Sequence, residues 1–283
     1  MSCDSLGDRM KGYENVSRIY LLRRLPVIIR VDGRAFHTFT RGFSRPFDAV
    51  LQKSMYAAAK GLCEQISGVK LAYVQSDEIS LLLTNDDALE TQPWFDNNLQ
   101  KLVSISASIA TMEFNRAFIR EYSAFGEAIE YAQGDVDKNG GPINLDEATK
   151  RLLSYQKVAM KAQFDARAFV IPPSEVTNYF IWRQQDATRN SVQMVARSLY
   201  SHKELMNKNT DELQEMIFQK GINWNDYPTP NKRGFCVVKK PCVVDLDTDS
   251  AVPVVRNKWV TDTDIPVFTQ DRDYIERLLK HDE

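Results

Sequence analysis

Two residue pairs, Asp32-Gly33 and Ser76-Asp77, each follow a short apolar run of the kind that forms a buried strand. Each pair puts a carboxylate at the end of a strand, and two carboxylates that meet can hold a pair of Mg²⁺ ions about 3.5–4 Å apart. Magnesium prefers oxygen ligands, so Asp32, Asp77 and the Gly33 carbonyl are the predicted ligands, with nucleotide phosphates completing the shell. The alternative is plain turn chemistry, because Asp, Ser and Gly often end strands.

The segment after Gly33 has the features of a phosphate-binding loop. Glycine lets the main chain approach a triphosphate closely. Backbone N–H groups of Arg34, Ala35, Phe36 and His37 can then donate to phosphate oxygens, and Arg45 can reach them as a charged donor. For His37, a place in the core or in a turn is an equally good interpretation.

The elements that must position these residues alternate between strands and helices. Apolar patterns predict strands over residues 26–31, 69–75, 79–84 and 164–171, and helices over residues 49–66 and 99–118. Asp48 is the expected N-cap of the first helix, and Ser76-Asp77 must lie in a tight hairpin turn. The order β-α-β-β-α-β is typical of a ferredoxin-like α+β unit with an antiparallel sheet. In that unit Asp32 and Asp77 reach the same edge.

The rest of the chain is expected to elaborate this core. Residues 172–174 are a helix-start signal for a helix that continues to about residue 200. A further helix is predicted over residues 203–219, and a strand or hairpin over residues 234–244. Residues 135–140 resemble the first half of an EF-hand loop, but the closing acids fall out of register, which favours a polar turn.

Composition limits the kind of protein. The chain has 283 residues, 43% of them apolar, so a large buried core is possible. Its formal net charge of −2 means that a nucleic acid would have to meet a local basic patch. No apolar run is long enough for a membrane span, and the four cysteines form no C-x-x-C pair, which favours a reduced, cytoplasmic protein. Three histidines leave little material for a His-rich zinc site or a Ser-His-Asp triad.

Five segments, in this order, resemble the motifs of the tRNA-histidine guanylyltransferase family. They are residues 29–37 (IRVDGRAFH), 43–48 (FSRPFD), 72–80 (AYVQSDEIS), 164–167 (FDAR) and 179–184 (YFIWRQ). Lys232-Arg233-Gly234 is similar to a later R-K-G element of the same family. The resemblance extends from about residue 25 to residue 234.

This resemblance implies an enzyme that adds nucleotides to the 5′ end of a tRNA, on a palm related to those of polymerases and nucleotidyl cyclases. The 5′ end is activated with ATP or carries a triphosphate, and the 3′-hydroxyl of an incoming NTP such as GTP attacks it. Two Mg²⁺ ions would bind Asp32, the Gly33 carbonyl and Asp77, with Glu78 in support. Residues 32–37, Ser76 and Asp77 would surround the nucleotide, and Arg45 stands where lysine is usual.

The resemblance also implies a single catalytic unit over residues 1–283 and a homotetramer built from two dimers. The palm would span residues 25–172, with an insertion at about residues 122–160. A C-terminal elaboration of helices and a β-hairpin would span residues 173–283.

One departure bears on the substrate. Histidine-specific enzymes carry an H-I-N-N-L-Y-N run after the fifth motif, whereas residues 188–194 read TRNSVQM and match it only at Asn190. The chain is more similar to the guanylyltransferase-like branch of bacteria, archaea and viruses, which repairs 5′-truncated tRNAs by template-directed addition. Template-directed addition is therefore our prediction, and addition of a single guanosine is the alternative. The changed run can also be a solvated helix surface.

Candidate tRNA contacts are basic or polar residues outside the palm: Arg183, Asn190, Lys208, Lys232, Arg233, Lys239 and Lys240. Such contacts position an RNA without reading its sequence, and any single lysine is equally an ordinary surface residue. A nucleotidyl cyclase on the same palm and a non-catalytic RNA-binding module are the other classes. The sequence shows no base-reading motif for the first and no evident sheet-face aromatics for the second.

Overall fold

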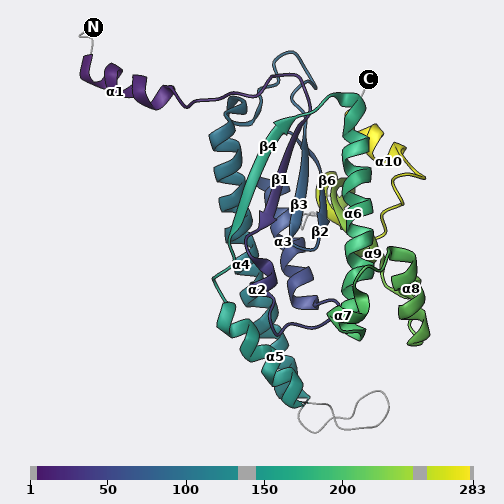
Figure 1. Ribbon diagram of the computed structural model, residues 1–283. Helices are drawn as coiled ribbons and strands as arrows, with labels where there is room; N and C mark the ends of the chain where they lie inside the picture. Colours follow the sequence, from purple (N-terminus) through teal and green to yellow (C-terminus); the bar gives the residue numbers. More distant parts are fainter. Residues whose placement is uncertain (1–4, 133–144, 245–253, 281–283) are drawn as a thin grey trace.

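Figure 1 shows the computed structural model, which describes residues 5–132, 145–244 and 254–280. The strands are β1 (Val27–Gly33), β2 (Val69–Gln75), β3 (Glu78–Leu83), β4 (Phe164–Val170), β5 (Phe235–Val244) and β6 (Val254–Asp262). The long helices are α1 (Ser5–Asn15), α3 (Ala49–Gln65), α4 (Leu99–Tyr131), α5 (Leu145–Val158), α6 (Pro173–Leu199) and α8 (Thr210–Gln219). The short helices are α2 (Phe36–Phe39), α7 (His202–Leu205), α9 (Thr229–Arg233) and α10 (Asp273–Glu276).

The strands form one sheet in the order β4-β1-β3-β2-β5-β6, and every neighbouring pair is antiparallel. β1 lies between β4 and β3, so Asp32 is paired with Asp165 on one side and with Glu78 on the other. Paired residues point to the same face of a sheet. Acidic residues that are far apart in the chain therefore share one row at one end of the sheet.

Helices α3 and α4 cover one face of the sheet. Val27, Ile29 and Val31 alternate along β1 and are buried against these helices. Aromatic rings fill the layer, with neighbouring rings such as Phe36–Phe39 and Phe114–Phe118 packed at 4.9 and 5.7 Å between centroids. This packing fixes the start of the loop that follows β1.

Helix α6 crosses the opposite face, together with α10 (Figure 1). Ile28 and Tyr73 point to this side and pack against Phe180 of α6. In Figure 1, α6 lies to one side of β4 and β1, and no other helix covers these two strands on this face. The sheet is therefore covered fully on one side and partly on the other.

The structure confirms the predicted mixture of helices and antiparallel strands, including the hairpin at Ser76-Asp77. Asp48 caps α3 as predicted, since its carboxylate accepts hydrogen bonds from the backbone N–H of Leu51 and of Ser44, each at 2.9 Å. Tyr155 of α5 donates to the same carboxylate at 2.7 Å. Helix α6 begins at the predicted proline pair.

Two predictions about helices need correction. The helix predicted over 99–118 continues to Tyr131. The helix predicted over 203–219 is two helices, because Asn207 has a positive φ and Asn209 forms a capping box that starts α8. β5 agrees with the predicted strand or hairpin over residues 234–244, and it pairs with β6, which was not predicted. Residues 135–140, the EF-hand-like run, lie outside the described residues.

No helix in the described part of the chain is long and apolar enough to cross a membrane.

Candidate active site

Asp32 and Asp77 lie at the same end of the sheet, where β1 finishes and the β2–β3 turn begins; we call this end the carboxylate edge. Asp32 is near the end of β1, and Asp77 follows Ser76 in the two-residue turn between β2 and β3, where Ser76 has a φ of 48°. The backbone N–H of Gly33 donates to the carbonyl of Asp77 at 3.1 Å, which ties the two segments together. The structure thus brings together the two carboxylates that the sequence singled out.

The pKa of each carboxylate is raised in this position. Burial is the main cause that raises the pKa of Asp77 to about 6; Asp32 and Glu78 add repulsion, and hydrogen bonds from the Ser76 side chain and from the backbone oppose the rise. Burial also raises the pKa of Asp32, with a further contribution from Asp165. Carboxylates that repel each other in a partly buried place are stabilised by a cation bound between them.

The donor atoms at this edge fit magnesium. Among the described residues, no group of three or more His, Cys, Asp or Glu side chains could hold a metal ion. A closed four-ligand zinc site is therefore not formed by those residues. Two carboxylates and a backbone carbonyl are hard oxygen donors, which suits Mg²⁺ because this ion usually keeps several waters and takes substrate phosphates as ligands.

The raised pKa of Asp77 predicts a pH effect on stability. Its pKa of about 6 in the folded protein exceeds the ordinary 3.8, so the folded state binds this proton more tightly than the unfolded state does. Its contribution to stability is complete below about pH 4 and is lost as pH rises through about 6. The test compares wild type with Asp77→Asn, both treated with a chelator. The free energy of unfolding of wild type, relative to that of the variant, should fall by on the order of 2 kcal/mol as the pH rises from about 4 to above about 6.

Denaturant unfolding at several pH values measures this difference. Groups far from Asp77 titrate equally in both proteins, so the difference reports Asp77 together with its coupling to Asp32 and Glu78. A difference that stays constant with pH, or grows as pH rises, would contradict the prediction.

Glu78 is held by a buried arginine from α6. The Nε and Nη2 atoms of Arg183 donate to the two carboxylate oxygens of Glu78 at 2.8 and 2.9 Å, and Nη2 also donates to Asp186 at 3.0 Å. The Arg183 side chain is only 7% exposed. Arg30 of β1 adds a weaker contact, since its Nε lies 3.9 Å from Glu78. The carboxylate of Glu78 is therefore oriented toward α6.

This arrangement departs from the prediction that Arg183 contacts tRNA. Its guanidinium is buried and bound by two carboxylates, so it is not offered to an RNA backbone. Asn190, another candidate tRNA contact on α6, is exposed, and its side chain donates to Asp186 at 3.3 Å. Of these two α6 residues, the structure therefore leaves only Asn190 accessible from solvent.

The loop after Gly33 divides its residues between the core and the surface. The N–H of Arg34 donates to the Gln163 carbonyl at 2.8 Å, and this bond takes up the N–H that was predicted to bind phosphate. The ring of Phe36 is buried and lies so close to Gly33 that a Cβ there would be 2.5 Å from it. Ala35 and His37 are exposed, as is Arg45 in the loop before α3. Gly33 is thus required by the packing of Phe36.

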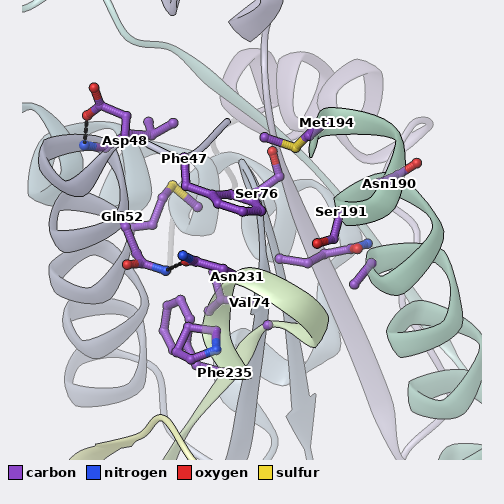
Figure 2. A pocket seen from close by; sticks show the side chains of 16 residues that line it. Phe47, Asp48, Gln52, Val74, Ser76, Asn190, Ser191, Met194, Asn231 and Phe235 are labelled. Atoms are coloured by element: carbon purple, nitrogen blue, oxygen red, sulfur yellow. Dashed lines mark hydrogen bonds between the residues drawn. The ribbon is translucent and has the colours of Figure 1, made fainter. Parts of the chain in front are cut away.

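A pocket opens beside Ser76, between α3, α6 and α9 (Figure 2). Its walls are mainly apolar and include Phe47, Met194 and Phe235. Polar groups converge on it as well, among them Gln52 and Asn231, whose amides are hydrogen-bonded at 2.9 Å. Apolar walls with a few fixed polar groups are typical of a small-molecule site.

Most residues of this pocket were missed by the sequence analysis, which named only Ser76 and Asn190 among them as candidate site residues. Phe47 lies just before the N-cap of α3, Gln52 is in the first turns of α3, Met194 is on α6 and Asn231 on α9. No motif links these segments, although Asn190 and Met194 are spaced to share one helix face. The tertiary structure alone brings them together.

The remaining candidate tRNA contacts are spread over several elements. Lys239 and Lys240 are exposed on β5; Lys239 lies 5.1 Å from the Trp259 ring centroid, and Lys240 is paired with Asp262 at 3.1 Å. Lys208 is exposed and paired with Glu212 at 2.9 Å. On α9, Lys232 donates to the Asn225 carbonyl, and the Arg233 carbonyl accepts from Tyr73.

Known proteins resemble this chain over most of its length. The family model described as tRNAHis guanylyltransferase (Thg1) matches residues 7–172. A tRNA(His) guanylyltransferase of Debaryomyces hansenii is 29% identical over 235 residues, covering 78% of this chain and 76% of the relative. A bacterial tRNA(His) guanylyltransferase (Thg1)-like protein in complex with ATP has a TM-score of 0.76 and 40% identity, covering 98% of this chain and 100% of that one. Its complex with GTP has a TM-score of 0.73 and 39% identity, covering 98% and 99%.

The carboxylate edge, the neighbouring pocket and these similarities define the class of the protein, which is a nucleotidyltransferase. Within that class, the chain belongs to the tRNAHis guanylyltransferase (Thg1) family.

Proposed function

We propose that the protein adds nucleotides in the 3′-to-5′ direction to the 5′ end of truncated tRNA, choosing each nucleotide by pairing with the opposite strand. The observation that carries the proposal is the meeting of Asp32 and Asp77 at one sheet edge, beside the pocket that contains Ser76. The similarity to solved bacterial Thg1-like proteins with ATP and with GTP supports nucleotides as substrates.

The proposed reaction has two steps. The 5′-phosphate of the RNA first attacks ATP, which forms an adenylylated 5′ end and releases pyrophosphate. The 3′-hydroxyl of the incoming NTP then attacks that phosphate, loses its proton and releases AMP. An RNA that already carries a 5′-triphosphate needs only the second step and releases pyrophosphate.

Asp32, the Gly33 carbonyl and Asp77 are the proposed ligands for two Mg²⁺ ions. When bound, these ions lower the pKa of an attacking hydroxyl and neutralise charge on the leaving phosphate. Glu78 is proposed as a positioning group, because both of its carboxylate oxygens are already bound by Arg183. Its adjacency to Asp77 then helps fix the turn that carries the metal ligand.

The nucleotide is proposed to lie with its base in the pocket and its phosphates toward the sheet edge. Apolar walls from Phe47 and Met194 suit a base, and the amides of Gln52 and Asn231 can present both donors and acceptors. Main-chain groups of residues 35–37, together with Arg45, are the proposed partners of the triphosphate.

Strand order β4-β1-β3-β2, with α3 and α4 on one face, supports a ferredoxin-like palm over residues 25–172. Helices α4 and α5 occupy the proposed insertion at residues 122–160, and the C-terminal elaboration spans residues 173–283. The exposed Lys239 and Lys240 on β5 are proposed phosphate contacts for tRNA. A homotetramer of two dimers and a cytoplasmic location are proposed from the family resemblance alone.

Template dependence is tested with one 5′-truncated tRNA and each of the four NTPs, while the opposing base is varied. We expect the added nucleotide to follow the opposing base, because Watson–Crick pairing then makes the choice. Gel analysis of the extended 5′ end with labelled NTP measures this. Constant addition of guanosine would favour the histidine-specific alternative, and no addition under any condition would contradict the proposed enzyme activity.

A further inference from the structure

Trp182 on α6 is an exposed aromatic side chain with a fixed position. All four tryptophans lie in the described ranges, and Trp182 is the one that is largely open to solvent, with 49% of its surface exposed. Single exposed apolar side chains are common on protein surfaces, so the surroundings of Trp182 decide whether it contacts a ligand.

The ring is held from behind by charged and aromatic neighbours. The guanidinium of Arg183 lies over it at 4.4 Å from the ring centroid, and Tyr179 packs against it edge-on at 5.9 Å. Arg183 is itself fixed by Glu78 and Asp186. The ring is therefore backed by a buried cation while about half of the Trp182 surface stays exposed, and stacking on the exposed part costs little side-chain ordering.

The position of Trp182 connects it to the proposed metal edge. Its ring contacts Arg183, Arg183 is bonded to Glu78, and Glu78 directly follows Asp77 in the chain. On the other side, Tyr179 packs on Phe169 of β4 at 5.9 Å. Through Tyr179 the ring is therefore next to β4, and through Arg183 it is next to Glu78 of β3.

The surroundings are polar, which argues against a contact between protein subunits. Residues three, four or seven positions from Trp182 lie on the same side of α6. Apart from Tyr179, these neighbours include Asn178, Gln185, Asp186 and Arg189, all of which are polar or charged. The Arg189 side chain is 57% exposed, and on β4 Arg167 is 51% exposed. Both arginines are also paired with carboxylates, Arg189 with Asp186 at 2.7 Å and Arg167 with Asp165 at 3.6 Å. An exposed ring in such a charged, polar setting suits a nucleobase, whereas the centre of a protein interface is depleted of charge.

We propose that Trp182 is a stacking platform for the terminal nucleobase at the 5′ end of the RNA. The proposal rests on the proposed function, because that function brings this end of the RNA to Asp32 and Asp77. Stacking reads no sequence, since every base has a π face, so the platform serves template-directed addition of any nucleotide.

The first test measures RNA affinity for full-length variants. Loss of a base–aromatic stack weakens binding by about 5- to 100-fold, so Trp182→Ala should raise the dissociation constant for a 5′-phosphorylated hairpin RNA by that factor. Trp182→Phe keeps an aromatic face and should bind nearly as tightly as wild type. Phe218→Ala is the matched control, because Phe218 is a 63% exposed aromatic on α8. The KM for NTP should be unchanged in all three variants.

The second test reports stacking directly and needs no turnover. The probe carries 2-aminopurine either as its first nucleotide or in the hairpin loop, and fluorescence is followed without NTP. Wild type and Trp182→Phe should quench the terminal probe, Trp182→Ala should not, and the loop probe should not respond to the substitution. Measurement on the wild type alone stays informative if Trp182→Ala fails to fold.

Two results would overturn the platform. One is a terminal probe that wild type does not quench. The other is unchanged RNA affinity of the Trp182→Ala variant. If that variant also sediments differently from wild type, Trp182 is a contact between subunits and not a platform for RNA. Failure of the proposed function is distinguishable, because it appears as absent nucleotide addition by wild type and leaves both binding tests interpretable.

Discussion

Replacement of Asp32 or Asp77 with alanine is expected to lower the rate of nucleotide addition by roughly 10³-fold or more, since metal-ion stabilisation contributes several kcal/mol. Each substitution removes one of the two carboxylates at the sheet edge, and the other cannot hold the same pair of ions alone. The measurement is single-turnover incorporation of labelled NTP into a truncated tRNA, over a range of Mg²⁺ concentrations.

Asp165→Ala is the matched control for this experiment. Asp165 is the register partner of Asp32 on β4, points to the same face and is exposed, but it is not among the proposed ligands. We expect it to retain most of the activity. Near wild-type rates for Asp32→Ala or Asp77→Ala, with folding confirmed by circular dichroism, would exclude the two-carboxylate site.

The second large effect is expected on stability, at the pair formed by Glu78 and Arg183. Arg183→Gln should lower the free energy of unfolding by about 3–5 kcal/mol, because it leaves the buried Glu78 carboxylate without its charge partner. Arg30 cannot replace Arg183, since its Nε is 3.9 Å from Glu78. Denaturant unfolding at neutral pH gives this quantity.

Two further variants separate the ion pair from general damage to α6. Arg189→Gln removes an exposed arginine that pairs with Asp186 at 2.7 Å, and its expected cost is below about 1 kcal/mol. The double variant Glu78→Gln with Arg183→Gln should be more stable than Arg183→Gln alone, because no unpaired charge remains. Equal losses for Arg183→Gln and Arg189→Gln would show that burial of the pair has no special cost.

Local sequence patterns predicted the elements that carry the site. Alternation and β-branched residues predicted the strand before Asp32, and the two-residue spacing at Ser76-Asp77 predicted the hairpin. Asp48 predicted the start of α3, and the proline pair predicted the start of α6. These predictions succeeded because each depends on neighbours within a few residues, where backbone geometry and capping dominate.

Other features depend on contacts between distant segments, and for these the local pattern was insufficient. The break between α7 and α8 lies in a segment with helical composition, and the capping box at Asn209 outweighs that preference. β6 has no strong pattern of its own and is ordered by pairing along β5. In the site, Arg183 was predicted to face an RNA, and it is buried because Glu78 lies opposite it on β3.

The sequence by itself therefore determined which residues are candidates for the proposed active site of this nucleotidyltransferase, because residue type and strand ends are local properties. Only the tertiary structure decided which side chains face one another. It brought Asp77 to Asp32 through the antiparallel order of β1 and β3, turned Arg183 inward, and assembled the pocket from α3, α6 and α9. The physical reason is that burial of charge and closure of a pocket are set by packing across the sheet, and no spacing along the chain encodes them.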